Sequence, residues 1–391
     1  MKYTQNERYN KFVSKCVQDL KEEIVSQFQP RSIILTGSFG KSEVTIFESN
    51  NGELSFSSDC EVIIIPKNYI LSSSKISEFK KAFFERKKLQ LSPNAILLTL
   101  QITIPFLRSR MKPTMFNYDL KFGSKVIFGE DYISKMPIYD SKDIPLQEGI
   151  RLLLNRMAEA AGNFSFGSDG PHIGYLCDKI LIACQDALLL TIGKYHFSYK
   201  KRNELFNQHF NKEFKEIFLN PEHTLKMINT ASSNKIEGLK TSVYPPSYYF
   251  EVQQICDPVF RHCIKKEMHF EFDSYSEFQS LYLNHFKNFC VMSLIKKMYY
   301  WLKISKSLRI PIKRLVFPMD VPFDQYIYAI TPIVYFMLSQ NNGIDQKKIS
   351  QTEKCLLSLN LIDTNREYVS NDEKFRIIND TYFRLWYHTF N

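Results

Sequence analysis

The chain has 391 residues, of which 44% are hydrophobic, with 32 Phe and 22 Tyr, so an intrinsically disordered protein is excluded and two domains are expected. The 51 basic and 41 acidic residues leave a net charge of +10, which favours polyanionic partners such as nucleotides or nucleic acid. The eight cysteines form no CxxC pair and have no histidine at ligand spacing, which argues against a zinc site and for a reducing, cytoplasmic compartment.

The first part of the chain mixes helical and strand patterns. Apolar residues recur at helical spacing over residues 5–28 and stop at Pro30, which predicts an amphipathic helix. A second, basic amphipathic helix is expected over 75–90. Short apolar runs bounded by turn residues predict strands at 32–36, 60–65, 95–104, 115–121 and 124–128. Together these elements predict an α/β domain over residues 1–145.

Helical patterns dominate the second part of the chain, so residues 146–391 are expected to form a mainly α-helical domain. Helices are predicted at 147–163, 174–193, 203–217 and 281–307, and loops rich in Pro, Ser and Asn at 218–248 and 308–325. The expected fold class is therefore α+β. No apolar run is long enough to span a membrane, so no membrane partner is expected.

Two carboxylates stand at positions i and i+2 in Ser58-Asp59-Cys60-Glu61. Because side chains alternate along a strand, Asp59 and Glu61 should point to one face and Cys60 to the other. Two adjacent anions repel one another unless a cation lies between them. Asp119, on the strand expected at 115–121, is the candidate third acid. Three such carboxylates can hold two Mg²⁺ or Mn²⁺ ions about 3.5–4 Å apart.

The segment Gly37-Ser38-Phe39-Gly40 follows the first predicted strand and should open a helix. Its backbone N–H groups and the Ser38 hydroxyl could face phosphate groups, and the glycines permit a close approach. Lys41 adds a positive charge. Gly37, Ser38 and Lys41 are therefore candidate nucleotide-binding residues.

The order of these features resembles the signature of the DNA polymerase beta-like nucleotidyltransferase superfamily. The features are a strand, Gly37-Ser38, then Ser58-Asp59-x-Glu61 entering an apolar strand, and then Asp119. The match covers about the first 130 residues. The resemblance implies that Asp59, Glu61 and Asp119 are catalytic and bind Mg²⁺, and that Gly37-Ser38 binds a nucleoside triphosphate. The family's usual second Asp is a Glu in this chain.

The spacing between the two parts of this signature departs from the family. Twenty residues separate Ser38 from Asp59, which is longer than the common arrangement. Apolar runs at 44–47 and 54–56 flank Asn50-Asn51-Gly52, a pattern typical of a β-hairpin. We therefore expect an inserted hairpin that leaves the site geometry intact.

A weaker similarity lies downstream. In the poly(A) polymerase and oligoadenylate synthetase branches, a helix Lys and a Ser-Tyr pair contact the triphosphate, and Lys179 with Ser198-Tyr199 has a similar spacing. The resemblance implies that these three residues bind nucleotide. The alternative is that Lys179 is a solvated helix residue and Tyr199 a core aromatic.

A basic segment at 296–314 is interleaved with aromatic residues and contains no acid. It could bind the backbone and bases of a nucleic acid, although solvated lysines on an amphipathic helix give the same pattern. The candidate contacts are Lys296, Lys297, Lys303, Arg309 and Arg314.

The expected reaction is attack of an acceptor hydroxyl on the α-phosphorus of a nucleoside triphosphate, with release of pyrophosphate. ATP is the expected donor because most relatives that the chain resembles use it. The acceptor stays open between a small molecule, an RNA or nucleotide, and a protein. The alternative is a non-catalytic nucleotide-binding or partner-binding module with the same fold.

Overall fold

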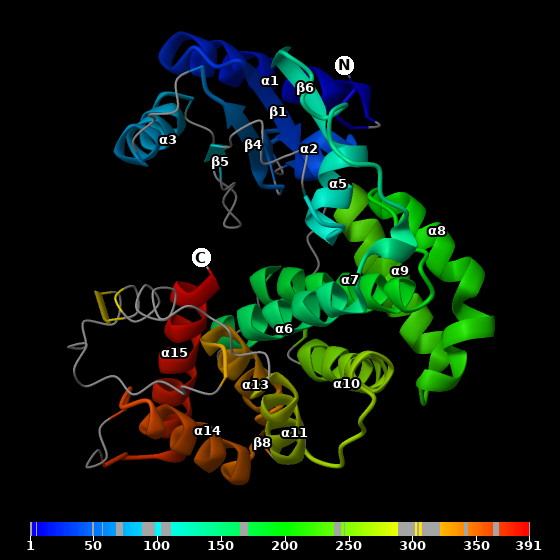
Figure 1. The fold of residues 1–391 in the computed structure, drawn as a ribbon, viewed down its shortest axis with the longest axis vertical. Helices are drawn as coiled ribbons and strands as arrows, with labels where there is room; N and C mark the ends of the chain where they lie inside the picture. The colour runs from blue at the N-terminus through cyan, green and yellow to red at the C-terminus, as the bar shows by residue number, and fades with distance from the viewer. Residues whose placement is uncertain are drawn as a thin grey trace. The chain divides into compact units, whose positions relative to one another are not determined.

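The structure is a computed structural model of the whole chain, shown in Figure 1. It describes residues 2–4, 6–48, 51–56, 58–67, 73–87, 98–102, 111–164, 171–237, 244–245, 247–287, 302, 305–306, 321–339, 343–362 and 367–390. The fold is α+β, as the sequence predicts.

The chain forms two compact units. The first comprises residues 1–148 and 188–242, and the second comprises residues 149–187 and 243–391. The first boundary lies close to the position expected near residue 145. Residues 188–242, however, belong to the first unit, so each unit is built from two separate segments of the chain.

The first unit is built on a four-stranded sheet with the order β5-β4-β1-β6. Strand β1 (Ser32–Thr36) pairs antiparallel with β4 (Cys60–Ile65) on one side and with β6 (Lys125–Gly129) on the other, and β5 (Leu98–Ile102) pairs in parallel with β4. All four were expected from their apolar runs. Because Thr36 pairs with Glu61, the end of β1 and the start of β4 lie at the same edge of the sheet.

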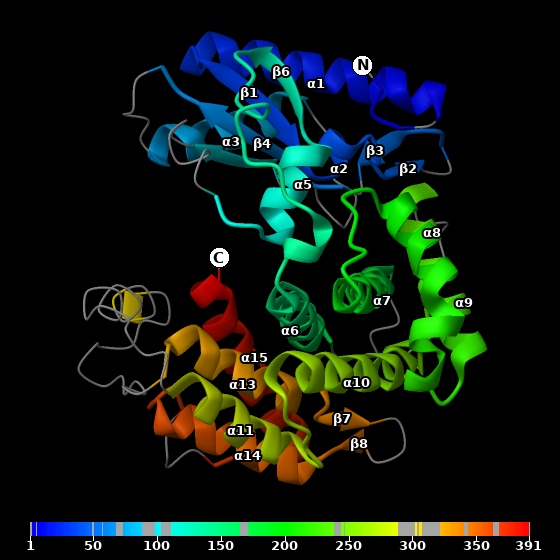
Figure 2. The ribbon, with the colours of Figure 1, turned by 45° about the vertical axis from the view of Figure 1, so that its right-hand side comes forward.

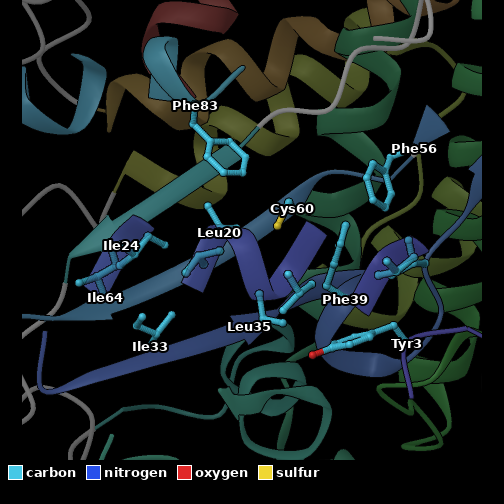
Figure 3. Packing of buried hydrophobic residues seen from close by; sticks show 14 of the residues in the cluster. Tyr3, Leu20, Ile24, Ile33, Leu35, Phe39, Phe56, Cys60, Ile64 and Phe83 are labelled. Carbon is cyan, nitrogen blue, oxygen red and sulfur yellow. The ribbon is translucent and has the colours of Figure 1, made fainter. Parts of the chain in front are cut away.

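Alternation along the strands separates two hydrophobic cores. Helices α1 (Glu7–Phe28) and α3 (Ser73–Lys87) bury their apolar side chains with Leu35, Val62 and Ile64 on one face, as Figure 3 shows for Leu35 and Ile64. On the other face, Ile34 and Ile63 pack against α5 (Met115–Gly123). Glu61 is two residues before Ile63 in β4, so its side chain points to the same face of the sheet, the face covered by α5.

The hairpin expected between Ser38 and Asp59 is confirmed. Strands β2 (Ile46–Glu48) and β3 (Leu54–Phe56) are antiparallel neighbours in a separate two-stranded sheet. Gly52 adopts a φ of 77° in the connecting turn, a conformation that glycine adopts without strain. Phe56 stacks on Phe12 of α1 and contacts Phe39, so the hairpin is fixed to the core of the first unit (Figure 3).

Two sequence predictions in the first unit are wrong. Residues 115–121 form helix α5 rather than a strand, because Thr114 caps its N-terminus by accepting a hydrogen bond from the Asn117 N–H at 3.1 Å. The segment 218–248 contains helix α9 (Pro221–Glu237) rather than only loop. Pro221 occupies the first helical position, where its missing N–H costs nothing.

The rest of the first unit is helical. It comprises α2 (Gly37–Lys41), a 3-10 turn (Ser141–Asp143), α8 (Tyr199–His209), a π-helical turn (Phe210–Phe214) and a 3-10 turn (Lys215–Ile217). Tyr195 packs against Tyr118 of α5, with 5.8 Å between the ring centroids, so the segment before α8 is fixed against α5.

The second unit is mainly helical, and Figure 2 shows its elements. It contains α6 (Leu146–Asn163) and α7 (Pro171–Thr191), which extend into the first unit by a few residues, and α10 (Ser247–Met268), α11 (Tyr275–Lys287), α13 (Phe323–Tyr335), α14 (Gln346–Ser358) and α15 (Asn371–Phe390). Strands β7 (Leu338–Ser339) and β8 (Gly343–Ile344) form a short antiparallel pair. Tyr328 and Trp386 both donate hydrogen bonds to Asn155, which ties α13 and α15 to α6.

Candidate functional site

The two parts of the predicted signature meet at one edge of the sheet. Gly37 begins α2 directly after β1, and its φ of 58° is favoured only for glycine. A Cβ atom at this position would lie 2.9 Å from Oε2 of Glu61. The glycine therefore allows the main chain to approach the Glu61 carboxylate closely.

Asp59 and Glu61 both lie at this edge. Asp59 is exposed immediately before β4, and Glu61 is half-buried within the strand. Burial raises the pKa of Glu61, and the charges of Asp59 and Asp119 raise it further, while Lys41 and Lys235 oppose the shift. Glu61 is therefore close enough to both Asp59 and Asp119 to feel their charges.

Asp119 comes to this cluster from helix α5 and not from the strand that the sequence predicts. Its Oδ2 accepts a hydrogen bond from Lys41 Nζ at 2.5 Å, and its Oδ1 accepts one from the Tyr195 hydroxyl at 3.0 Å. Both carboxylate oxygens thus have partners within the first unit.

Lys41 is a buried cation, with only 4% of its side chain exposed. Burial alone would lower its pKa, but the neighbouring Asp119 and Tyr199 outweigh that effect, and the pKa of Lys41 is raised. Lys41 therefore stays charged and serves as the counter-ion of Asp119. Gly40 makes this packing possible, because a Cβ there would lie 2.4 Å from the carbonyl oxygen of Gly123 on α5.

Ser198 and Tyr199 are brought to the same region by helix α8. Ser198 caps this helix, and its hydroxyl donates a hydrogen bond to Glu43 Oε1 at 2.7 Å. The Tyr199 and Lys200 N–H groups also donate to the Glu43 carboxylate, at 2.9 and 3.1 Å. Glu43 thus fixes the start of α8 against the residues that follow α2, and Ser198 has a structural role in this arrangement.

Three cations surround the ring of Tyr199. The Arg202 guanidinium lies 4.1 Å, Lys41 Nζ 4.8 Å and Lys235 Nζ 5.4 Å from the ring centroid. Arg202 and Lys235, together with Glu43 and Tyr195, are not among the residues predicted from the sequence. The basic run at 200–202 was a signal for Arg202, whereas Lys235 lies in the segment mistaken for a loop.

Lys179 lies in the second unit. Its Nζ forms an ion pair with Glu159 of α6 at 2.8 Å and lies 4.9 Å from the ring centroid of Tyr175. Glu159 also pairs with Arg156 at 2.5 Å. The nucleotide contact expected for Lys179 stays a prediction.

The donor set at the sheet edge consists of carboxylate oxygens, which are the ligands that Mg²⁺ prefers. Asp59 directly before β4 and Glu61 within it fit a divalent cation in the type of their side chains. Within the residues that the structure describes, no three acidic, His or Cys side chains are gathered in a metal-binding arrangement. The pairing of Asp119 with Lys41 keeps the third acid from that role in this conformation.

The basic segment is placed only in small part. Lys296, Lys297, Lys303, Arg309 and Arg314 lie outside the described residues, as does most of the helix expected over 281–307. In the described part of the chain, no helix has the length and apolar content needed to cross a membrane.

Comparison of the sequence with models of known protein families gives no match, and comparison with curated proteins gives none either. Any assignment of function therefore depends on the residues of the site itself.

Proposed function

We propose that the first unit is a Mg²⁺-dependent nucleotidyltransferase that moves a nucleoside monophosphate, with AMP from ATP as the default, onto an acceptor hydroxyl and releases pyrophosphate. The observation that carries the proposal is the meeting of Gly37-Ser38 with Asp59 and Glu61 at one sheet edge, with Asp119 within electrostatic range. This is the combination that the polymerase beta-like resemblance requires.

Each residue has a proposed role. Asp59 and Glu61 would hold the metal, and Asp119 would join them and take the proton of the acceptor hydroxyl once its pair with Lys41 opens. Gly37 and Ser38 would bind the triphosphate at the edge of the sheet. When bound, Mg²⁺ would neutralise the charge of the phosphates and the leaving group.

The surrounding cations support binding of a polyanion. Lys41, Arg202 and Lys235 lie around one tyrosine ring beside the acids. A triphosphate carries several negative charges, and charged hydrogen bonds to it are stronger than neutral ones. The acceptor is proposed only as a class, namely a small molecule, an RNA or nucleotide, or a protein.

One observation favours a second candidate function. Both oxygens of Asp119 are engaged by Lys41 and Tyr195, as expected if this acid were a structural element of a nucleotide-binding module without turnover. The two candidates differ in one measurable property, since only the enzyme releases pyrophosphate.

The test is pyrophosphate release by the purified chain with Mg²⁺ and each nucleoside triphosphate in turn, with and without cell extract to supply an acceptor. We expect release with the unchanged chain and none with Asp59→Ala/Glu61→Ala. Glu222→Ala, which removes an exposed acid from α9, is the matched control and should keep full release. Binding of ATP without release under every condition would favour the module instead.

A further inference from the structure

Lys235 of α9 is placed beside the candidate site by contacts that the family resemblance does not predict. The Thr45 hydroxyl donates a hydrogen bond to the main-chain oxygen of Lys235 at 2.5 Å, and the Thr45 N–H donates to Ser58 Oγ at 2.9 Å. Thr45 directly precedes β2 of the inserted hairpin. The insertion and α9 therefore hold each other in place next to Asp59.

The ammonium group of Lys235 makes only weak contacts among the described residues. It donates a hydrogen bond to Ser58 Oγ at 3.5 Å, the outer limit for such a bond, and lies 5.4 Å from the centroid of the Tyr199 ring. Among the described residues, no carboxylate lies within ion-pairing distance of Lys235. An ammonium group has three donors, so Lys235 retains hydrogen-bonding capacity for a ligand.

The charges around Lys235 indicate which ligand would use that capacity. Lys41 and Arg202 share the Tyr199 ring with it, and Lys41 is already paired with Asp119. An anion entering this region would therefore find Lys235 as a half-buried cation beside Glu61 and the Gly37 edge.

We propose that Lys235, held in place by the inserted hairpin, binds the polyphosphate chain of the nucleotide and makes the site prefer a triphosphate over a monophosphate. This inference rests on the proposed function, because it assigns a further residue to the same site. The inserted hairpin departs from the spacing of the family, and helix α9 lies where a loop was expected. The proposal gives both elements the same role, which is to position Lys235 for selection of the substrate.

The test is calorimetric titration of ATP, AMP and inorganic tripolyphosphate into four forms of the chain, with a thermal melt to confirm folding. Lys235→Ala should bind ATP and tripolyphosphate about ten- to a hundredfold more weakly, while its affinity for AMP stays within about twofold. Lys235→Arg should retain most of the affinity. Lys226→Ala removes an exposed lysine from the same helix and should bind all three ligands like the unchanged chain.

The outcomes separate the two proposals. If the unchanged chain binds ATP and Lys235→Ala binds it equally well, the role of Lys235 is wrong while the proposed function stands. An equal loss for ATP and AMP would show that Lys235 only supports the structure of the site, and would also overturn the inference. If the unchanged chain binds neither ATP nor tripolyphosphate, the proposed function itself fails.

Discussion

The two units each contain a lysine that the sequence marked as a nucleotide ligand, and each lysine is paired with a carboxylate. Lys41 pairs with Asp119 in the first unit, where the side chains are 4% and 19% exposed. Lys179 pairs with Glu159 in the second unit, where both side chains are 24% exposed. The first pair lies among the predicted catalytic acids, and the second joins two helices of the second unit.

The two ion pairs differ in whether the carboxylate still has a cationic partner after its lysine is removed. Among the described residues, Asp119 has Lys41 as its ionic partner and the Tyr195 hydroxyl as its other hydrogen-bond partner, whereas Glu159 keeps Arg156 if Lys179 is lost. A buried charge without its partner is strongly destabilising, whereas a partly exposed one can be hydrated. Removal of Lys41 should therefore destabilise the fold more than removal of Lys179.

The largest expected effect is on the first pair. Lys41→Met should lower the free energy of unfolding by about 3 kcal/mol, at the low end for a broken buried pair because part of Asp119 is exposed. Lys41→Met/Asp119→Leu should recover most of that loss, because no charge is left unpaired. Urea denaturation measures both variants, and a double variant as unstable as the single one would contradict the assignment.

Substitution of two glycines distinguishes the effect of backbone strain from the effect of displacing the Glu61 side chain. Gly37→Ala and Gly52→Ala both place a side chain at positive φ, at 58° and 77°, and each should lose about 1 kcal/mol of stability. Only at Gly37 would the new Cβ lie 2.9 Å from Glu61, whereas at Gly52 its nearest neighbour is Glu48 Oε1 at 3.8 Å.

Pyrophosphate release should therefore fall at least about tenfold in Gly37→Ala and stay unchanged in Gly52→Ala, because displacement of a group by about 1 Å can cost that much rate. Equal activities in the two variants would show that the approach of Gly37 to Glu61 has no functional importance.

Loss of the ion pair between Lys179 and Glu159 in the second unit should have a smaller effect. Lys179→Met is expected to cost less than about 1 kcal/mol of unfolding free energy, since Glu159 retains Arg156. Calorimetric titration should find its ATP affinity within about threefold of the unchanged chain, because Glu159 already pairs with Lys179. A larger loss of affinity would contradict this prediction and favour the phosphate contact that the family resemblance implies.

The smallest effect concerns pH. Burial would raise the pKa of Glu159, but Arg156 and Lys179 outweigh burial and hold the pKa below its ordinary value of 4.5. The stability that Glu159 contributes is therefore present above pH 4.5 and is lost as the pH falls through the lowered pKa. Glu159→Gln should be less stable than the unchanged chain near neutral pH, and urea denaturation should find this gap closing in acid. A gap that widens in acid would contradict the pairing.

The sequence predicted correctly those features that depend on residues close together in the chain. Alternation along β4 correctly placed Glu61 on the face opposite Cys60, and Asn51-Gly52 correctly marked the hairpin turn. The error at 115–121 arose because Phe116, Tyr118 and Leu120 alternate as they would in a strand. The capping residue Thr114 was the local sign of a helix that the apolar pattern outweighed.

Contacts between distant residues could not be predicted in the same way. Lys41 and Asp119 are separated by 78 residues, and Ser58 and Lys235 by 177. No periodicity connects such positions, because tertiary packing alone brings them together. The sequence therefore singled out Asp59, Glu61, Asp119 and Lys41, but not the ion pair between Lys41 and Asp119 or the lysine that α9 adds.

The most direct test of the account follows two labels of ATP. The chain is incubated with Mg²⁺, cell extract and ATP labelled either at the α- or at the γ-phosphate. Nucleotidyl transfer predicts that α-label moves onto an extract component and γ-label leaves as pyrophosphate, and that Asp59→Ala/Glu61→Ala stops both. Transfer of γ-label to the acceptor, or transfer that survives loss of the two acids, would contradict the central claim.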